Sequence, residues 1–192
     1  MVGNGGTARA RAASPWRIAP WIGAAALLSV PALAMRFAPE AGIDWSAGDF
    51  VVMGAMLAAA CGALELAMRM SNDWSFRAAA ALAVGTGFLL LWANLAVGLV
   101  GDEGNPVNWL FVGVLAVAAA GALAARFRAP GLARAMAATA VAQLAAAAIA
   151  FAATPAIPRP GVPVEIAALF GIFPALWLLS AWLFHRAGRT AD

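Results

Sequence analysis

The chain has 192 residues, of which 64% are hydrophobic and 11% charged, and its formal net charge is +3. A soluble domain is close to half apolar and a quarter charged, so this composition excludes an ordinary water-soluble protein and indicates helices that lie in lipid. All twelve basic residues are arginine, and the chain has one histidine, one cysteine and no tyrosine. These counts exclude a lysine Schiff base with retinal or pyridoxal phosphate, tyrosyl chemistry, an intramolecular disulfide, a bis-histidine haem and a histidine-cluster metal site. We therefore expect no cofactor and no metal.

Long apolar segments follow one another along the whole chain. A helix needs about 20 apolar residues to cross a hydrocarbon core of about 30 Å. We predict an all-α integral membrane bundle, with a basic, disordered N-terminus over residues 1–17 and a short tail over residues 185–192. Its six spanning helices are expected over residues 18–37, 48–68, 78–100, 109–127, 132–153 and 164–184.

The first span has two interpretations. Arg9, Arg11 and Arg17 precede an apolar core that ends in "VPALA", Val30–Ala34, which is the pattern of a signal peptide cleaved before Met35. The apolar stretch is also long enough to span, and we favour an uncleaved first helix. Cleavage at this site would leave five spans.

The connections between spans carry helix start and stop signals. "SAGD" has the form of a capping box, with Ser46 as N-cap and Asp49 at the third helical position. In "GDEGNP", Asn105 and Pro106 have the pattern of an N-cap followed by a first helical proline. "APG" at residues 129–131 predicts a turn.

Arginine placement predicts the orientation. If the N-terminus is cytoplasmic, ten of the twelve arginines fall in inner segments, and only Arg36 and Arg159 fall outside. Because inner loops of membrane proteins are enriched in arginine and lysine, both termini are predicted to be cytoplasmic.

Two hairpins have similar sequences. "GAMLAAACGALELAMR" (54–69) aligns with "GVLAVAAAGALAARFR" (113–128), and "RAAAALAV" from Arg77 aligns with "RAMAATAV" from Arg134. The pattern indicates a parallel repeat of spans 2–3 and 4–5. The alternative is that alanine-rich helices share glycine for packing and arginine where they emerge.

Three strongly polar side chains fall inside predicted spans: Glu65, Asn94 and Gln143. Glu65 is expected to pair with Arg69 at i+4, and a proton or substrate role is the alternative. The two amides are expected to form interhelical hydrogen bonds. Because the three groups lie at different depths, they do not indicate a continuous ion pathway.

Other polar residues gather at the predicted outer helix ends. They are Asp49, Asp102, Glu103, Asn105, Asn108 and Glu165. Solvation and helix capping explain them best, and binding of a hard cation such as Ca²⁺ is the alternative, although no spacing matches a calcium loop.

Two features concern the deeper parts of the spans. Pro174, in "FGIFPALWLLSAW", is predicted to kink the sixth span because proline removes one backbone hydrogen bond. Trp92 and Trp177 lie deeper than interfacial tryptophans usually do. Core packing is the favoured interpretation, and a lipid or quinone groove is the alternative.

The stretches "NLAVGLVGDEGNP", "GVLAV", "GALAARFR" and "SAWLFHRA" carry a resemblance over roughly residues 44–187. The chain resembles an uncharacterised family of small, alanine-rich, multi-pass inner-membrane proteins of proteobacteria. The resemblance implies a helical bundle in a bacterial inner membrane, and it implies no catalytic residue.

Three classes of function follow. A non-catalytic accessory or structural membrane protein, which stabilises or assembles a partner, is favoured because the chain is small and has no reactive constellation. The alternative is a small homo-oligomeric transporter or channel, supported by the repeat, Pro174, Glu65 and the outer acids. A membrane enzyme is least favoured, because no nucleophile, base pair or metal set is visible. Expected partners are the lipid bilayer and a membrane protein or second copy, and nucleic acid is not expected.

Overall fold

A computed structural model describes residues 15–101, 104–153 and 167–189 of the chain. Over these residues the protein is all-helical and contains no strand, which confirms the predicted fold class. Six of the described helices are long and apolar enough to cross a membrane, and this is the architecture of a multi-pass membrane protein. Asp102, Glu103 and Glu165, and most of the predicted N-terminal segment, lie outside the described residues.

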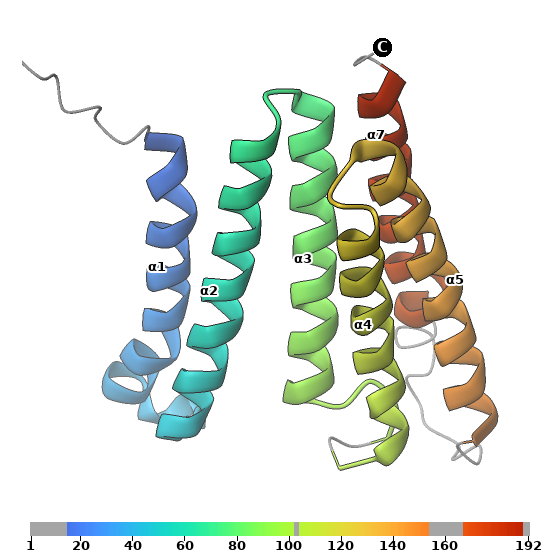
Figure 1. Ribbon diagram of the computed structural model, residues 1–192. Coiled ribbons are helices and arrows are strands. Elements are labelled where there is room, and N and C mark those ends of the chain that lie inside the picture. The colour runs from blue at the N-terminus through green and yellow to red at the C-terminus, as the bar shows by residue number, and fades with distance from the viewer. Residues whose placement is uncertain (1–14, 102–103, 154–166, 190–192) are drawn as a thin grey trace, which may run out of the picture. The chain divides into compact units, whose positions relative to one another are not determined.

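Five of the long helices begin and end within four residues of the predicted spans, and α7 ends five residues beyond its predicted end (Figure 1). They are α1 (Pro15–Phe37), α2 (Ala47–Met70), α3 (Trp74–Ala96), α4 (Trp109–Ala124), α5 (Ala129–Ala153) and α7 (Phe173–Arg189). Two short 3₁₀ helices, η1 (Pro39–Ala41) and η2 (Pro106–Asn108), lie in connections. A π-helical stretch, η3 (Ala167–Ile172), leads directly into α7.

Helix α3 begins four residues before its predicted start and ends four residues before its predicted end. The Asp73 carboxylate caps the helix by accepting a hydrogen bond from the Phe76 N–H at 2.8 Å. After Ala96 the chain leaves the helix through Gly98 and Gly101, whose φ angles are 70° and 81°. Only glycine adopts such angles without strain, so this pair of glycines fixes the end of α3.

The turn between α4 and α5 lies earlier than predicted. The "APG" stretch opens α5, and the turn is formed instead by the residues before it, with Arg126 and Phe127 at φ angles of 49° and 57°. Proline is well tolerated in a first helical turn, where its missing N–H would have no helical partner. The prediction of a turn at residues 129–131 was therefore wrong.

The chain divides into two compact units, an N-terminal unit up to Cys61 and a C-terminal unit from Gly62. In the N-terminal unit, the Cys61 thiol of α2 donates to the Pro20 carbonyl oxygen of α1 at 3.4 Å.

The predicted capping box at the start of α2 is confirmed. The Ser46 N–H donates to Asp49 Oδ2 at 2.7 Å, and the Asp49 N–H donates to Ser46 Oγ at 3.3 Å.

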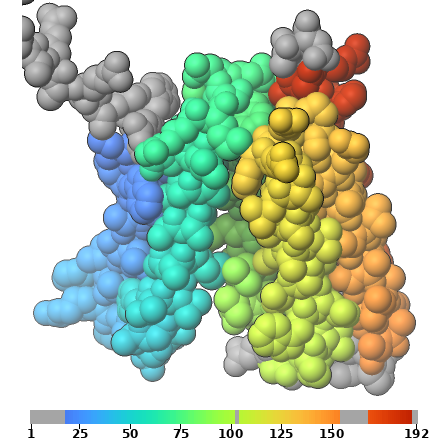
Figure 2. All heavy atoms as spheres, in the orientation of Figure 1, coloured from blue at the N-terminus to red at the C-terminus, as the bar shows by residue number. Residues whose placement is uncertain are grey.

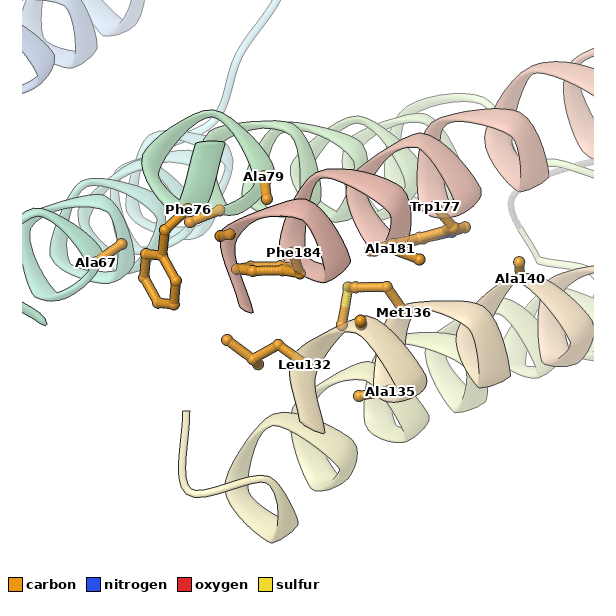
Figure 3. Close-up of a cluster of buried hydrophobic side chains, with 13 residues drawn as sticks. Ala67, Phe76, Ala79, Leu132, Ala135, Met136, Ala140, Trp177, Ala181 and Phe184 are labelled. Carbon is orange, nitrogen blue, oxygen red and sulfur yellow. The ribbon is translucent and has the colours of Figure 1, made fainter. Parts of the chain in front are cut away.

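In the C-terminal unit, α7 packs against α3 and α5, and α4 packs against α5. Two clusters of buried apolar side chains form its core. The first cluster includes Phe76, Ala79, Leu132, Met136, Ala140, Trp177, Ala181 and Phe184. The second cluster is Leu90, Phe111, Val114, Ala146, Ala147, Ala150, Leu169 and Phe173. Figure 3 shows α7 side chains of the first cluster facing those of α5.

Helices α4 and α5 approach each other closely along a seam of small residues. A Cβ atom on Gly121 would lie 2.7 Å from Ala135 Cβ, and a Cβ atom on Gly131 would lie 2.7 Å from Ala125 Cβ. Gly121 and Ala125, the residue that directly follows α4, form one Gly-x-x-x-Ala pair. Gly131 and Ala135 of α5 form the other, and the two pairs meet in antiparallel order. Small residues at such spacing let helix backbones come close enough for dispersion contacts in lipid. In the space-filling view the atoms of α4 and α5 meet along this side of the unit (Figure 2).

Candidate functional site

The polar side chains in the interior of the C-terminal unit are the first place to look for chemistry. All the buried polar residues in the described part of this unit are neutral. They are Thr86, Asn94, Asn108, Thr139, Gln143 and Ser180. The unit therefore offers hydrogen-bonding groups to a ligand in its interior and no buried charge.

The three buried hydroxyl groups donate to backbone carbonyls. Thr86 Oγ1 donates to the Leu82 oxygen at 2.7 Å, and Thr139 Oγ1 donates to the Ala135 oxygen at 2.9 Å, both within their own helices. Ser180 Oγ of α7 donates to the Ala79 oxygen of α3 at 2.9 Å, so this bond ties two helices together. Sequence alone did not single out Ser180, because its partner is 101 residues away.

The Gln143 carboxamide differs from the prediction at both of its polar atoms, and the Asn94 carboxamide differs at its oxygen. Within the described residues, both polar atoms of the Gln143 carboxamide and Oδ1 of Asn94 are buried without a hydrogen-bond partner. The predicted interhelical hydrogen bond of Gln143 is therefore absent, because α5 meets alanine and apolar side chains on its packed face. The indole Nε1 of Trp177 is also buried without a partner among these residues. Trp177 belongs to the core, as favoured from its sequence position, whereas Trp92 is 43% exposed, so the prediction of core packing was wrong for Trp92.

Glu65 forms the predicted ion pair near the end of α2. Its Oε1 accepts a hydrogen bond from Arg69 Nη2 at 2.7 Å, in the i,i+4 arrangement. The Arg69 side chain is mostly exposed, so the pair lies at the surface of the helix bundle. This arrangement favours a structural pair at the end of a span over a deeply placed proton carrier.

The described members of the predicted outer group serve the chain's own helix ends. Asn105 Oδ1 accepts from the Val107 N–H at 3.0 Å and caps η2, as predicted. Asn108 Oδ1 accepts from the N–H groups of Leu99 and Val100 at 3.1 Å and 2.9 Å, so it holds the loop that follows α3. No group of three or more metal-ligating side chains occurs within residues 15–101, 104–153 and 167–189.

The aligned positions of the predicted repeat have different surroundings in the C-terminal unit. A Cβ atom on Gly62 would meet nothing within 4 Å, whereas the aligned Gly121 lies against Ala135. Arg77 donates to the Met68 and Ser71 carbonyl oxygens at 3.1 Å and 2.8 Å, and so binds the end of α2. The repeat stays a prediction from sequence, and these positions have distinct structural roles.

Helix geometry changes next to Pro174, where the sequence predicts a kink. The π-helical residues 167–172 end directly before Phe173 and Pro174, both of which are buried. A proline has no backbone N–H and crowds the carbonyl one turn earlier, so a regular α-helix is disfavoured there. Leu169 in this stretch is buried, whereas Phe170 and Ile172 are 37% and 56% exposed, so the irregular backbone lies at the edge of the core.

Comparison with known proteins adds no relative. No protein-family model matches the chain. No curated protein and no solved structure matches it either. The resemblance to proteobacterial inner-membrane proteins stays a prediction, and function must be inferred from the helices themselves.

Proposed function

We propose that this chain is a non-catalytic accessory protein of a bacterial inner membrane, with both termini in the cytoplasm. In this proposal the C-terminal unit is the stable core, and the N-terminal unit presents helices to a partner membrane protein. The arginine distribution supports the orientation, because positive residues favour the cytoplasmic side. The proposed binding partner is another membrane protein of the same bilayer.

The difference in burial between helices carries this proposal. In the apolar 18-residue segment of α5, 44% of the residues are buried, whereas in the corresponding segment of α1 only 6% are buried. Helix α1 nevertheless has a sequence suited to helix packing, with Gly23 followed by three alanines and with Pro20 and Pro31 inside the helix. Small residues let a second helix approach closely, and contact with lipid alone does not require them.

Site-specific photocrosslinking in native membranes tests the proposal. A photoreactive amino acid is placed at Val51 in the N-terminal unit, whose side chain is 71% exposed. Leu123, which is 66% exposed in the C-terminal unit, is the matched control. We expect one protein adduct of defined mass at residue 51 and lipid adducts at residue 123. Lipid adducts alone at both positions contradict the accessory function.

A small homo-oligomeric transporter or channel is the second candidate. The observation that favours it is the π-helical stretch directly before the buried Pro174 of α7, together with the unpaired Gln143 carboxamide of α5, since irregular helices often accompany transport sites. This function is tested by reconstituting the protein in vesicles and comparing solute flux through the unaltered protein with flux through the variants Glu65→Gln and Asp102→Asn. Abolished flux in a folded variant supports this function, and unchanged flux in both removes these residues from any pathway.

A further inference from the structure

The unpaired groups of α5 and α7 lie at the same level of the C-terminal unit. Ala140 of α5 shares the first cluster with Trp177 and Ala181 of α7, whereas Ala147 of α5 shares the second cluster with Phe173 of α7. Numbers rise along α5 as they fall along α7, so the two helices run antiparallel. Gln143, between Ala140 and Ala147, therefore lies level with the turn of α7 from Phe173 to Trp177.

This turn of α7 is the one that follows the π-helical stretch. Pro174 occupies it and supplies no backbone N–H, so one carbonyl of the preceding turn loses its usual helical donor. The same turn ends at Trp177, whose indole Nε1 has no partner among the described residues. The Trp177 ring tip reaches α3, where Cη2 lies 3.7 Å from the position of a Cβ atom on Gly87.

The surroundings of Gln143 are closed to bulk solvent and to lipid. The Gln143 side chain is completely buried, and Trp177 is 1% exposed. A carboxamide provides two donors and one acceptor, and an indole provides one donor. Burying these groups without partners is costly, and buried polar groups in proteins are almost always satisfied by protein or by ordered water.

We propose that water binds inside the C-terminal unit, at the Gln143 carboxamide and the Trp177 indole N–H. The chemistry of the groups selects a neutral molecule, because every buried polar side chain in the described part of this unit is uncharged. The site needs acceptors for the indole N–H and the amide N–H groups, and a donor for the amide oxygen. Water does all of this in the smallest volume, and buried waters typically make about three hydrogen bonds.

Gln143 can be observed without overlap from other glutamine signals, because it is the only glutamine in the chain. The protein is labelled with side-chain ¹⁵N-glutamine, reconstituted in lipid vesicles and examined by water-edited solid-state NMR. We expect the single side-chain amide signal to receive magnetisation from water. A second readout is the Trp177 indole N–H, assigned by its loss in Trp177→Phe, which is expected to exchange in D₂O.

A relocated glutamine is the matched control. Leu144 is the next residue of α5 and is 40% exposed, so the double variant Gln143→Met/Leu144→Gln moves the amide to the outer face at the same depth. We expect the water-edited signal to be lost in this variant. For the indole readout, Trp182 of α7 is the control, since it is 54% exposed on the outer face.

Three results overturn the proposal. The first is a Gln143 amide without water contact in the unaltered protein. The second is a direct cross-peak between the Gln143 amide and the Trp177 indole nitrogen, which would mean a dry hydrogen-bonded pair. The third is contact of the amide with lipid protons equal to that of the relocated glutamine, which would place lipid at the site.

Discussion

The seam between α4 and α5 predicts a specific loss of stability when Gly121 is changed to alanine. The new Cβ atom would lie 2.7 Å from Ala135 Cβ and 3.4 Å from Ala135 Cα. Carbon atoms pack best at about 3.5–4.0 Å, so the two helices must separate by roughly 1 Å along the seam. Overpacking of this kind typically costs about 1–3 kcal/mol of unfolding free energy.

The glycine aligned with Gly121 in the predicted repeat provides the control. Alanine is the better helix former by about 1 kcal/mol, and this gain applies at both positions. A Cβ atom on Gly62 meets nothing within 4 Å, so Gly62→Ala keeps the gain without the clash. The difference between the two variants therefore isolates the packing cost, which we expect to be about 1–3 kcal/mol.

The assay is reversible unfolding of the purified protein in mixed micelles, followed by tryptophan fluorescence. The exchanged pair Gly121→Ala/Ala135→Gly is expected to recover most of the loss, because the extra methyl group then faces a glycine. Equal stability of Gly121→Ala and Gly62→Ala refutes the close approach of the two backbones. Failure of the exchanged pair to recover stability refutes the assigned contact between Gly121 and Ala135.

The remaining predictions concern hydrogen bonds and use the same unfolding assay. Asn108→Ala removes the acceptor of two loop N–H groups and is expected to cost about 1–3 kcal/mol, and an unchanged midpoint would contradict the loop-holding role. Arg77→Met removes bonds to the end of α2 and is expected to cost about 1–2 kcal/mol. Arg134→Met, at the aligned position, removes one exposed bond to the Pro130 carbonyl oxygen at 3.3 Å and is expected to be nearly neutral. Equal losses of stability in these two variants would contradict a specific role of Arg77 in holding the end of α2. Ser180→Ala loses the bond between α7 and α3 and is expected to cost about 0.6 kcal/mol, with no change if the hydroxyl bonds elsewhere.

Features that depend on neighbouring residues could be predicted from the sequence. The Ser46–Asp49 box, the Asn105 cap and the Glu65–Arg69 pair each join residues within four positions, so residue type and spacing were sufficient. The six spans followed from apolar length alone. "APG" was misassigned because proline and glycine can open a helix as well as end one, and only the left-handed Arg126 and Phe127 show where the turn lies.

Features that depend on distant residues could not be predicted in this way. The Gly121–Ala135 contact requires the register of two antiparallel helices, and many alanines in this chain would fit equally well. The partner of Ser180 lies 101 residues away. Gln143 was expected to bond across helices, and it is unpaired among the described residues. A single sequence does not show which of its distant residues are in contact.

Native mass spectrometry of the C-terminally tagged protein, extracted gently from its own membranes, tests the central claim most directly. The accessory function predicts a complex in which this chain is bound to a different membrane protein in a fixed stoichiometry. A monomer without a partner would contradict it, and a closed homo-oligomer would contradict it and favour the transporter.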